Sequence, residues 1–173
     1  MIWFTADQHY AHSNIVKYCD RPFVDVQEMN YELIRRHNEI VKPSDTIYMI
    51  GDVTLNGIET FEDYMNQLNG LIYVLPGSHD HRWLKDFDSK LGLRNVQLLP
   101  ALYSLELDNR LVVVLCHYAL RVWDRSHYGA ISLYGHSHGK LPPEGRQMDV
   151  GVDCHNFYPV SLDYVLQMLN NND

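Results

Sequence analysis

Strand-length apolar runs that end in the same kind of turn are the feature that most constrains this chain. Five such runs stop at a short turn that carries Asp or His, and three of these turns contain glycine. In chain order the turns are Asp7-Gln8-His9, Gly51-Asp52, Gly77-Ser78-His79-Asp80, Cys116-His117 and Gly135-His136-Ser137-His138. Ligands of layered α/β proteins collect outside the carboxyl ends of the strands. The pattern therefore predicts an α/β fold in which these turns converge on one site.

The order of the predicted elements is βαβαβ at first and mostly β afterwards, which suggests two packed sheets with helices outside. Apolar runs predict strands at 2–6, 46–50, 71–75, 96–99, 102–107, 111–116, 131–134 and 148–152. Helical spacing of apolar residues predicts helices at 14–19, 26–41, 59–68, 83–91 and 160–169, with Ser13 as the cap of the first. The chain has 173 residues, no internal repeat and no linker, so we expect a single domain over residues 1–173.

Charge and cysteine content exclude several classes of function. The formal net charge of −8 disfavours a general binder of nucleic-acid backbones held by a basic surface. Three cysteines without a Cys-x-x-Cys pair fit a reducing cytoplasm, and we expect each to be a small apolar residue in or near the core. No apolar run approaches the ~20 residues of a membrane span. We therefore expect a cytoplasmic protein that does not enter a membrane.

Imidazole and carboxylate groups at the strand ends predict a metal site. Without thiolate, this donor set suits Mn²⁺, Fe, Zn²⁺ or Ni²⁺ better than Ca²⁺ or Mg²⁺. The donors are too many for one four-coordinate structural zinc, and two ions that share a bridging carboxylate use them better. Two cations ~3.5–4 Å apart can clamp a phosphate oxygen and polarise a shared water. Such ions would also supply the positive field that an acidic chain lacks.

As a set, these motifs resemble the calcineurin-like metallophosphoesterases, and most of all their small, single-domain bacterial and phage-type members. The resemblance rests on Asp7-x-His9, Gly51-Asp52, Gly77-x-His79-Asp80, His117 and Gly135-His136-x-His138. It covers residues 1 to about 138 of the chain. It implies a four-layer αββα sandwich with two mixed sheets flanked by helices. It also implies hydrolysis of phosphate esters with two divalent metal ions, Mn²⁺ foremost.

The resemblance assigns the metal ligands residue by residue. Asp7, His9 and His138 would hold a first ion, and His117 and His136 would hold a second. The carboxylate of Asp52 would bridge the two ions. The family usually has a ligating Asn where this chain has Ser78. A serine hydroxyl is shorter and a weaker donor than an amide oxygen. Ser78 is thus the one ligand position in doubt, and it either reaches the second ion, yields its place to water or bonds to substrate.

The resemblance also implies catalytic roles, and neighbouring residues are candidates for substrate binding. A hydroxide that bridges the ions would attack phosphorus, and His79 would protonate the leaving oxygen, oriented by Asp80. His12 and His81 lie close in sequence to the turns and are candidate substrate contacts. Arg21 has the fork geometry that can clamp a phosphate. His81 would line the substrate entrance; the alternatives are that His12 is a loop histidine and that Arg21 is a surface cation.

Several residues outside the motifs have alternative interpretations. Asp153 and His155 are candidates to support a metal-binding histidine from behind. Trp83 and Trp123 flank the predicted site and could stack a nucleobase, but a structural role is the better interpretation for each. His37, on the long helix, is expected to be structural or solvated.

The substrate stays open at the level of sequence. We expect a small phosphate ester, with a leaning to cyclic or nucleotide-like phosphodiesters that rests on the resemblance and on the lack of added domains. The alternatives are a phosphomonoesterase, a non-catalytic metal-binding interaction module of the same fold, and a single structural metal. No arginine follows Gly51-Asp52 closely, which disfavours the phosphoprotein phosphatases of the superfamily. We expect a monomer or a homodimer without an extended nucleic-acid surface.

Overall fold

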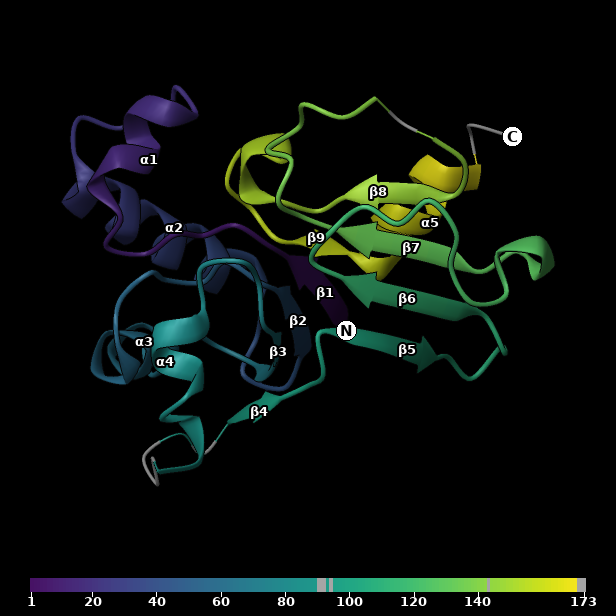
Figure 1. The fold of residues 1–173 in the computed structure, drawn as a ribbon, viewed down its shortest axis with the longest axis horizontal. Coiled ribbons are helices and arrows are strands. Elements are labelled where there is room, and N and C mark those ends of the chain that lie inside the picture. Colours follow the sequence, from purple (N-terminus) through teal and green to yellow (C-terminus); the bar gives the residue numbers. More distant parts are fainter. Residues whose placement is uncertain (90–92, 94, 143, 171–173) are drawn as a thin grey trace.

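Two mixed β-sheets frame the fold in this computed structural model, which describes residues 1–89, 93, 95–142 and 144–170 (Figure 1). In sheet order, the first consists of β4 (Val96–Leu98), β3 (Leu71–Leu75), β2 (Thr46–Ile50), β1 (Ile2–Thr5) and β9 (Val160–Ser161). The second consists of β5 (Leu102–Glu106), β6 (Val112–Cys116), β7 (Ile131–Tyr134) and β8 (Gln147–Asp149). Only β9 and β5 run antiparallel to their neighbours in the described chain. The prediction of two mixed sheets is confirmed.

Parallel pairing brings the predicted turns to common sheet edges. Thr5 of β1 lies opposite Met49 of β2, and Met49 lies opposite Val74 of β3. The turns that follow these three strands therefore leave the first sheet along one edge. In the second sheet, Leu115 of β6 lies opposite Leu133 of β7, and the next turns again share an edge. In Figure 1 the arrowheads of β1, β6 and β7 end in the same central region.

Helices cover the outer face of the first sheet. They are α1 (Ser13–Tyr18), α2 (Val26–Ile40), α3 (Ile58–Met65) and α4 (His81–Leu84). On α2 the buried residues Met29, Leu33 and His37 recur every four positions and form one face. The Asp25 side chain begins this helix by accepting a hydrogen bond from the backbone N–H of Glu28. These helices and the sheet share one apolar cluster, which anchors the turns of the first sheet on a packed base.

A second apolar cluster fills the space between the sheets. Phe4 and Ile50 of the first sheet pack there with Leu115 and Leu133 of the second. Helix α5 (Leu162–Asn170) adds Val165 to this cluster and contacts β1, β8 and β9. The two sheets are therefore packed face to face, and α5 lies where both can reach it.

The outer face of the second sheet differs from the four-layer expectation. Val112 and Val114 of β6 pack there with Ala130, Leu120 and Trp123 from the connection between β6 and β7. This connection contains a 3₁₀ turn at Ser126–Tyr128. Within the described residues, the fourth layer is thus a loop and not a layer of α-helices, because one side of a short sheet can be covered by a few loop side chains.

Most predicted element boundaries shift by one to three residues; the helix predicted at 59–68 is Ile58–Met65, and the strand predicted at 148–152 is Gln147–Asp149. Three departures change the kind of structure or the cap. The helix predicted at 83–91 is the short α4 and a 3₁₀ turn at Phe87–Ser89, and positions 90 and 91 lie outside the described residues. Residues 160 and 161, predicted as the start of a helix, form β9 because they pair with β1. Ser13 is the first helical residue of α1, whose cap position is occupied by His12 without a side-chain bond.

The three cysteines were expected to lie in or near the core. Cys116 is buried and Cys19 is half-buried, as expected, but Cys154 is exposed, so its assignment to the core is wrong.

None of the helices in the described ranges is long and apolar enough to cross a membrane.

Candidate metal centre

Six Asp and His side chains from the predicted turns meet in two groups. The first donor group consists of Asp7, His9 and His138, and the second donor group consists of Asp52, His117 and His136. Within each group, one possible ligand atom per residue lies within 4.8 Å of the others. Each group is therefore positioned to bind a metal ion. The structure brings together the same six residues, in the same division, that the resemblance implied.

The Asp52 carboxylate lies between the two donor groups. Its Oδ2 atom is 3.3 Å from Nε2 of His117 in its own group and 3.7 Å from Nε2 of His9 in the first. Burial alone would raise the pKa of Asp52, but His117 and a backbone N–H bond from His79 outweigh it and hold the pKa below its ordinary value. Asp52 is therefore an ionised carboxylate that faces both groups, as a bridging ligand must.

Five of the six donor residues have a left-handed backbone conformation. They are Asp7, with φ 61°, His9, with φ 54°, Asp52, with φ 56°, His136, with φ 65°, and His138, with φ 48°. Residues other than glycine rarely adopt such angles, which cost free energy. Strain of this kind gathers at functional sites, where a sharp turn must aim a side chain in one direction. The turns at the strand ends thus adopt strained backbone angles that direct these side chains toward one another.

The histidines of the donor groups have ring nitrogens that suit a cation. Both ring nitrogens of His9 are buried without a hydrogen-bond partner, and burial lowers its pKa to about 3. In His117, Nδ1 donates to the carbonyl of Ile50 at 2.8 Å, so Nε2, 3.3 Å from Oδ2 of Asp52, is the nitrogen that can bind a metal. Buried nitrogen atoms without a partner are costly, and neutral imidazoles are the form that binds metals. The donor set therefore fits a divalent cation.

Two carboxylates of the centre lie directly over glycine backbone. A Cβ atom on Gly77 would be 2.4 Å from Oδ1 of Asp52, and a Cβ atom on Gly135 would be 2.7 Å from Oδ2 of Asp7. Such distances are too short for any side chain. The Asp7 carboxylate also accepts the backbone N–H of His136, at 2.8 and 3.1 Å from its two oxygens. Burial raises the pKa of Asp7 to about 7, so this carboxylate gains most from a cation beside it.

Ser78 bonds to the carboxylate of Asp52. Its hydroxyl oxygen lies 3.2 and 3.0 Å from the two oxygens of Asp52 and donates to them. This contact places Ser78 against the second donor group. Whether its hydroxyl ligates an ion stays a prediction.

Two other histidines from the sequence analysis lie beside His9, and a third lies on α4. The ring centroids of His79 and His12 both lie 5.6 Å from that of His9. Neither residue belongs to a donor group, so both are available to contact a substrate bound at the centre. His81 is the first residue of α4 and is exposed. The use of His12 and His81 in substrate binding stays a prediction.

The prediction that Asp80 orients His79 is wrong. Asp80 is buried, and its two oxygens accept bonds from the backbone N–H groups of residues 52–54 and of Gly77, and from the indole N–H of Trp83. Five donors saturate the carboxylate, which therefore fastens two turns of the first sheet together. The same contact confirms that Trp83 has a structural role.

The prediction that Arg21 clamps a phosphate is also wrong. Its side chain is 0% exposed, and its Nε and Nη2 atoms each donate to Asp153 at 2.8 Å. The guanidinium further donates to the backbone carbonyls of Asp7, at 2.7 Å, and Gln8, at 2.9 Å. The sequence could not show this because Asp153 lies 132 positions away along the chain.

Asp153 lies behind a histidine of the first donor group, as the sequence analysis suggested. Its Oδ2 atom is 2.7 Å from Nδ1 of His138. Burial alone would lower the pKa of His138, but the Asp153 carboxylate outweighs it and raises this pKa. His155, the other candidate for this role, instead bonds through Nε2 to the carbonyl of Asp149. The support of His138 by Asp153 is therefore confirmed, and that by His155 is wrong.

Asp149 is a structural anchor of the centre that the sequence analysis missed. Its Oδ2 atom accepts bonds from the hydroxyl of Ser137 and the backbone N–H of Gly139, and its Oδ1 atom accepts from Gly151. It thereby holds the turn that carries two of the donor histidines. The sequence analysis missed it because position 149 lay inside the strand predicted at 148–152, whereas the structure ends β8 at Asp149.

A third group with metal-binding spacing consists of Cys19, His138 and Asp153. Here Arg21 already provides a cation, since its guanidinium bonds to both oxygens of Asp153. Burial also raises the pKa of the Cys19 thiol, which disfavours the thiolate that a metal needs. This third group is therefore a neutralised ion pair and not a further metal site.

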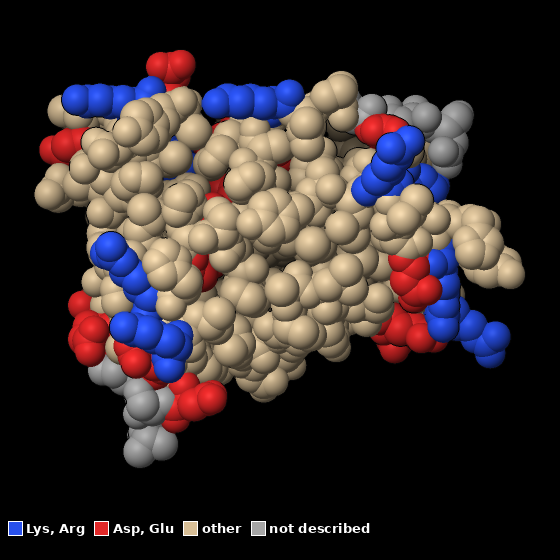
Figure 2. All heavy atoms as spheres, in the orientation of Figure 1, with Lys and Arg blue, Asp and Glu red and all other residues tan. Residues whose placement is uncertain are grey.

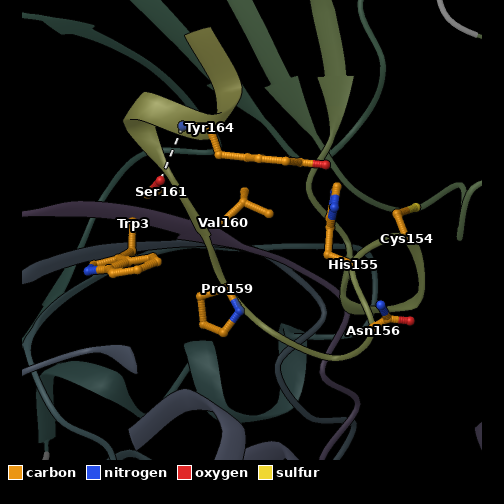
Figure 3. A pocket seen from close by; sticks show the side chains of 8 residues that line it. All are labelled: Trp3, Cys154, His155, Asn156, Pro159, Val160, Ser161 and Tyr164. Carbon is orange, nitrogen blue, oxygen red and sulfur yellow. Dashed lines mark hydrogen bonds between the residues drawn. The ribbon is translucent and has the colours of Figure 1, made fainter. Parts of the chain in front are cut away.

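Figure 3 shows a cavity of about 320 Å³ that is separate from the donor residues. Its lining residues are Trp3, Cys154, His155, Asn156, Pro159, Val160, Ser161 and Tyr164. The rings of His155 and Tyr164 meet at 6.0 Å between centroids. None of the lining residues belongs to a donor group, so the two donor groups of the described chain lie at the strand ends and not in this cavity.

Comparison with solved structures supports the fold. A protein of unknown function from Aquifex aeolicus, AQ665, has a TM-score of 0.72 with 18% sequence identity, covering 97% of this chain and 98% of that one. A solved archaeal phosphodiesterase has a TM-score of 0.45 with 16% identity, covering 87% and 81%, a likeness too low to bear on fold or activity. The first similarity shows that this arrangement of elements is shared across nearly the whole chain.

Comparison with sequences identifies a relative. No family model matches the chain. The uncharacterized protein MJ1445 of Methanocaldococcus jannaschii is 30% identical over 177 aligned positions, which cover 97% of this chain and 90% of that protein. At this identity and coverage, the chain belongs to the same protein family as MJ1445.

Proposed function

We propose that this protein is a metal-dependent phosphoric ester hydrolase that uses two divalent cations. The observation that carries the proposal is the position of the Asp52 carboxylate, 3.3 Å from His117 and 3.7 Å from His9, between two groups of donors. The proposal is further supported by the order of the motifs along the chain, which resembles that of the metallophosphoesterases. A single structural ion would leave half of these six donors without a function.

The donor set favours manganese as the metal. Each group combines imidazole with carboxylate and contains no thiolate, which suits Mn²⁺ first, with Fe, Zn²⁺ or Ni²⁺ as alternatives. When bound, two such cations would polarise an attacking water and stabilise the charge that develops on the phosphate oxygens. The protein contributes the fixed positions of the donors, since strained turns and glycine contacts leave them little freedom.

His79 is the candidate general acid. Its ring lies beside His9 but outside both donor groups, so its proton stays available for the leaving oxygen. Because Asp80 is saturated by other donors, His79 is positioned instead by its backbone N–H, which donates to Oδ1 of Asp52 at 2.8 Å. The same aspartate thus faces the donor groups and holds the turn of the general acid.

We propose small phosphodiesters, including cyclic or nucleotide-like esters, as the substrate class. The face drawn in Figure 2 is largely uncharged, with Lys and Arg side chains mostly toward its margins. This distribution and the net charge of −8 suit a small ester better than an extended nucleic acid, which would need a basic track. We further propose that the protein acts as a monomer or homodimer.

The test is a paired assay with bis-p-nitrophenyl phosphate and p-nitrophenyl phosphate, with and without added Mn²⁺. The proposal predicts that Mn²⁺ is required for turnover and that the diester is hydrolysed with the higher kcat/KM. A higher kcat/KM for the monoester would identify a phosphomonoesterase. Binding of Mn²⁺ without turnover of either ester would contradict the proposal and favour a non-catalytic metal-binding module.

A further inference from the structure

Arg21 joins three segments that are distant in sequence. It lies in the loop after α1 and bonds to the backbone carbonyls of the β1 turn, at Asp7 and Gln8. It also bonds to both oxygens of Asp153 in the 3₁₀ turn Val152–Cys154. These four hydrogen bonds are between 2.7 and 2.9 Å long. A guanidinium with this many fixed partners is a rigid connector and not a mobile cation.

Asp153 connects Arg21 to His138 of the first donor group. One of its oxygens is 2.7 Å from Nδ1 of His138, and the same oxygen accepts a bond from Nη2 of Arg21. A carboxylate in this position holds the imidazole proton on Nδ1. The Nε2 atom of His138 is then left with its lone pair, as the nitrogen that can bind a metal beside Asp7 and His9.

We infer that Arg21 and Asp153 are positioning residues that build the first donor group before any ion binds. Asp153 selects the proton position of His138, and Arg21 fixes Asp153 relative to the Asp7 turn. This inference rests on the proposed function because it assigns a purpose to a metal-binding group. It extends that function by giving the first group a rigid support of its own, whereas the second group is held by Ser78, by backbone groups and by the bond from the His136 N–H to Asp7.

The inference makes a specific prediction about where the proton of His138 lies. In the metal-free protein, ¹⁵N NMR of the imidazole should report a proton on Nδ1. Removing only one partner would leave a buried charge without a counter-ion, so the informative variant is the double change Arg21→Met with Asp153→Leu. In this variant we expect the His138 proton to move to Nε2, which a merely structural pair would not cause.

The second readout is metal affinity, measured by calorimetric titration with Mn²⁺. The double variant should bind the tighter ion roughly 10–100-fold more weakly, the usual effect of losing a partner behind a ligand histidine. Asp153→Asn keeps an oxygen that can accept the Nδ1 proton, so it should retain the proton position and lose less affinity. Arg21→Lys keeps the charge but not the paired contacts, and its affinity should also fall between wild type and the double variant.

Arg36, on helix α2, offers a matched control because it contacts the loop that follows Asp153. Its side chain donates to the carbonyl of Asn156 and packs over the ring of Phe157, but it contacts no donor residue. Arg36→Lys should leave both the affinity for Mn²⁺ and the His138 proton position unchanged. A loss as large as that of Arg21→Lys would mean that the affinity change reports only loop stability, and would overturn the inference.

The remaining outcomes are equally decisive. A folded double variant with an unchanged His138 proton position and unchanged affinity would overturn the inference. If the double variant does not fold, unchanged affinity in both Arg21→Lys and Asp153→Asn would overturn it. Neither readout needs turnover, so a wild-type protein that binds Mn²⁺ without hydrolysing esters would contradict the proposed function and leave the inference standing.

Discussion

The hydroxyl of Ser78 donates to the carboxylate of Asp52, with oxygen–oxygen distances of 3.2 and 3.0 Å. A hydroxyl that is engaged with this carboxylate is poorly placed to act as a strong ligand of its own. We therefore expect the second donor group to have one strong protein ligand fewer than the resemblance to metallophosphoesterases implies, and the two proposed sites to differ in affinity.

Substitution of Ser78 should reveal this inequality. An amide oxygen reaches one bond further than a hydroxyl, so Ser78→Asn should strengthen binding of the weaker Mn²⁺ ion by about tenfold, or ~1.4 kcal/mol. Calorimetric titration of both proteins would measure the two dissociation constants. Two equally tight sites in the wild type, unchanged in the variant, would show that the position does not limit metal binding.

His79→Ala should reduce the rate without removing the metals. A general acid typically contributes 10²- to 10⁴-fold, so a loss of roughly that size is expected for esters with poor leaving groups. For nitrophenyl esters the loss should be smaller, because nitrophenolate leaves without protonation. Steady-state kinetics on a matched pair of alkyl and nitrophenyl esters would test this, and an equal loss on both would argue against the acid role.

Gly135→Ala should damage the first donor group. The new Cβ atom would lie 2.6 Å from the Cβ of Ala6 and 2.7 Å from Oδ2 of Asp7, so backbone or carboxylate must shift. Overpacking of this kind costs about 1–3 kcal/mol of stability and should also weaken binding of the tighter ion. Gly57→Ala is the control, since its Cβ would meet its nearest neighbour at 3.4 Å. Similar thermal unfolding and Mn²⁺ affinity in both variants would contradict this account.

His37 should make the stability of the protein depend on pH. This histidine is buried under α2, its Nε2 donates to the carbonyl of Asn69 at 2.9 Å, and burial lowers its pKa from 6.5 to about 4. The unfolded chain therefore takes up a proton first as the pH falls. The stabilisation is complete above pH 6.5 and is lost progressively toward pH 4, by up to about 3 kcal/mol.

The measurement is denaturant unfolding of the metal-free protein and of His37→Gln at several pH values. Glutamine can donate to the same carbonyl but does not titrate in this range. The difference in unfolding free energy between the two proteins should shrink as the pH falls from 6.5 to 4. A constant difference would show that His37 does not titrate as its burial implies.

The sequence predicted the site better than it predicted the contacts that support it. Parallel strands bring their carboxyl ends to one edge, so the order of turns along the chain was enough to predict that Asp7, Asp52 and the donor histidines would meet. The roles of Asp80 and Arg21 were predicted wrongly because each depends on which groups burial leaves as partners. A carboxylate such as Asp80 can orient a histidine or accept hydrogen bonds from backbone N–H groups, and only the packed structure distinguishes these two roles.

Element boundaries failed for a similar reason. Residues 160 and 161 continue an apolar helical pattern, yet they pair with β1 because the edge of that strand is free to accept them. The outer layer of the second sheet is a loop because Leu120 and Trp123 suffice to cover Val112 and Val114. Neither outcome is encoded in local periodicity, since both depend on which surfaces remain uncovered after the rest of the chain has packed.

The most direct test of the two-cation account is Mn²⁺ titration of metal-free protein, followed by calorimetry and by hydrolysis of bis-p-nitrophenyl phosphate in the same samples. Wild type should bind two ions of unequal affinity, and activity should rise mainly with the second. Asp52→Asn should weaken both ions and abolish turnover, whereas Asp163→Asn, an exposed aspartate on α5, should match wild type. Full activity in verified metal-free wild type, or two undiminished sites in Asp52→Asn, would contradict the account.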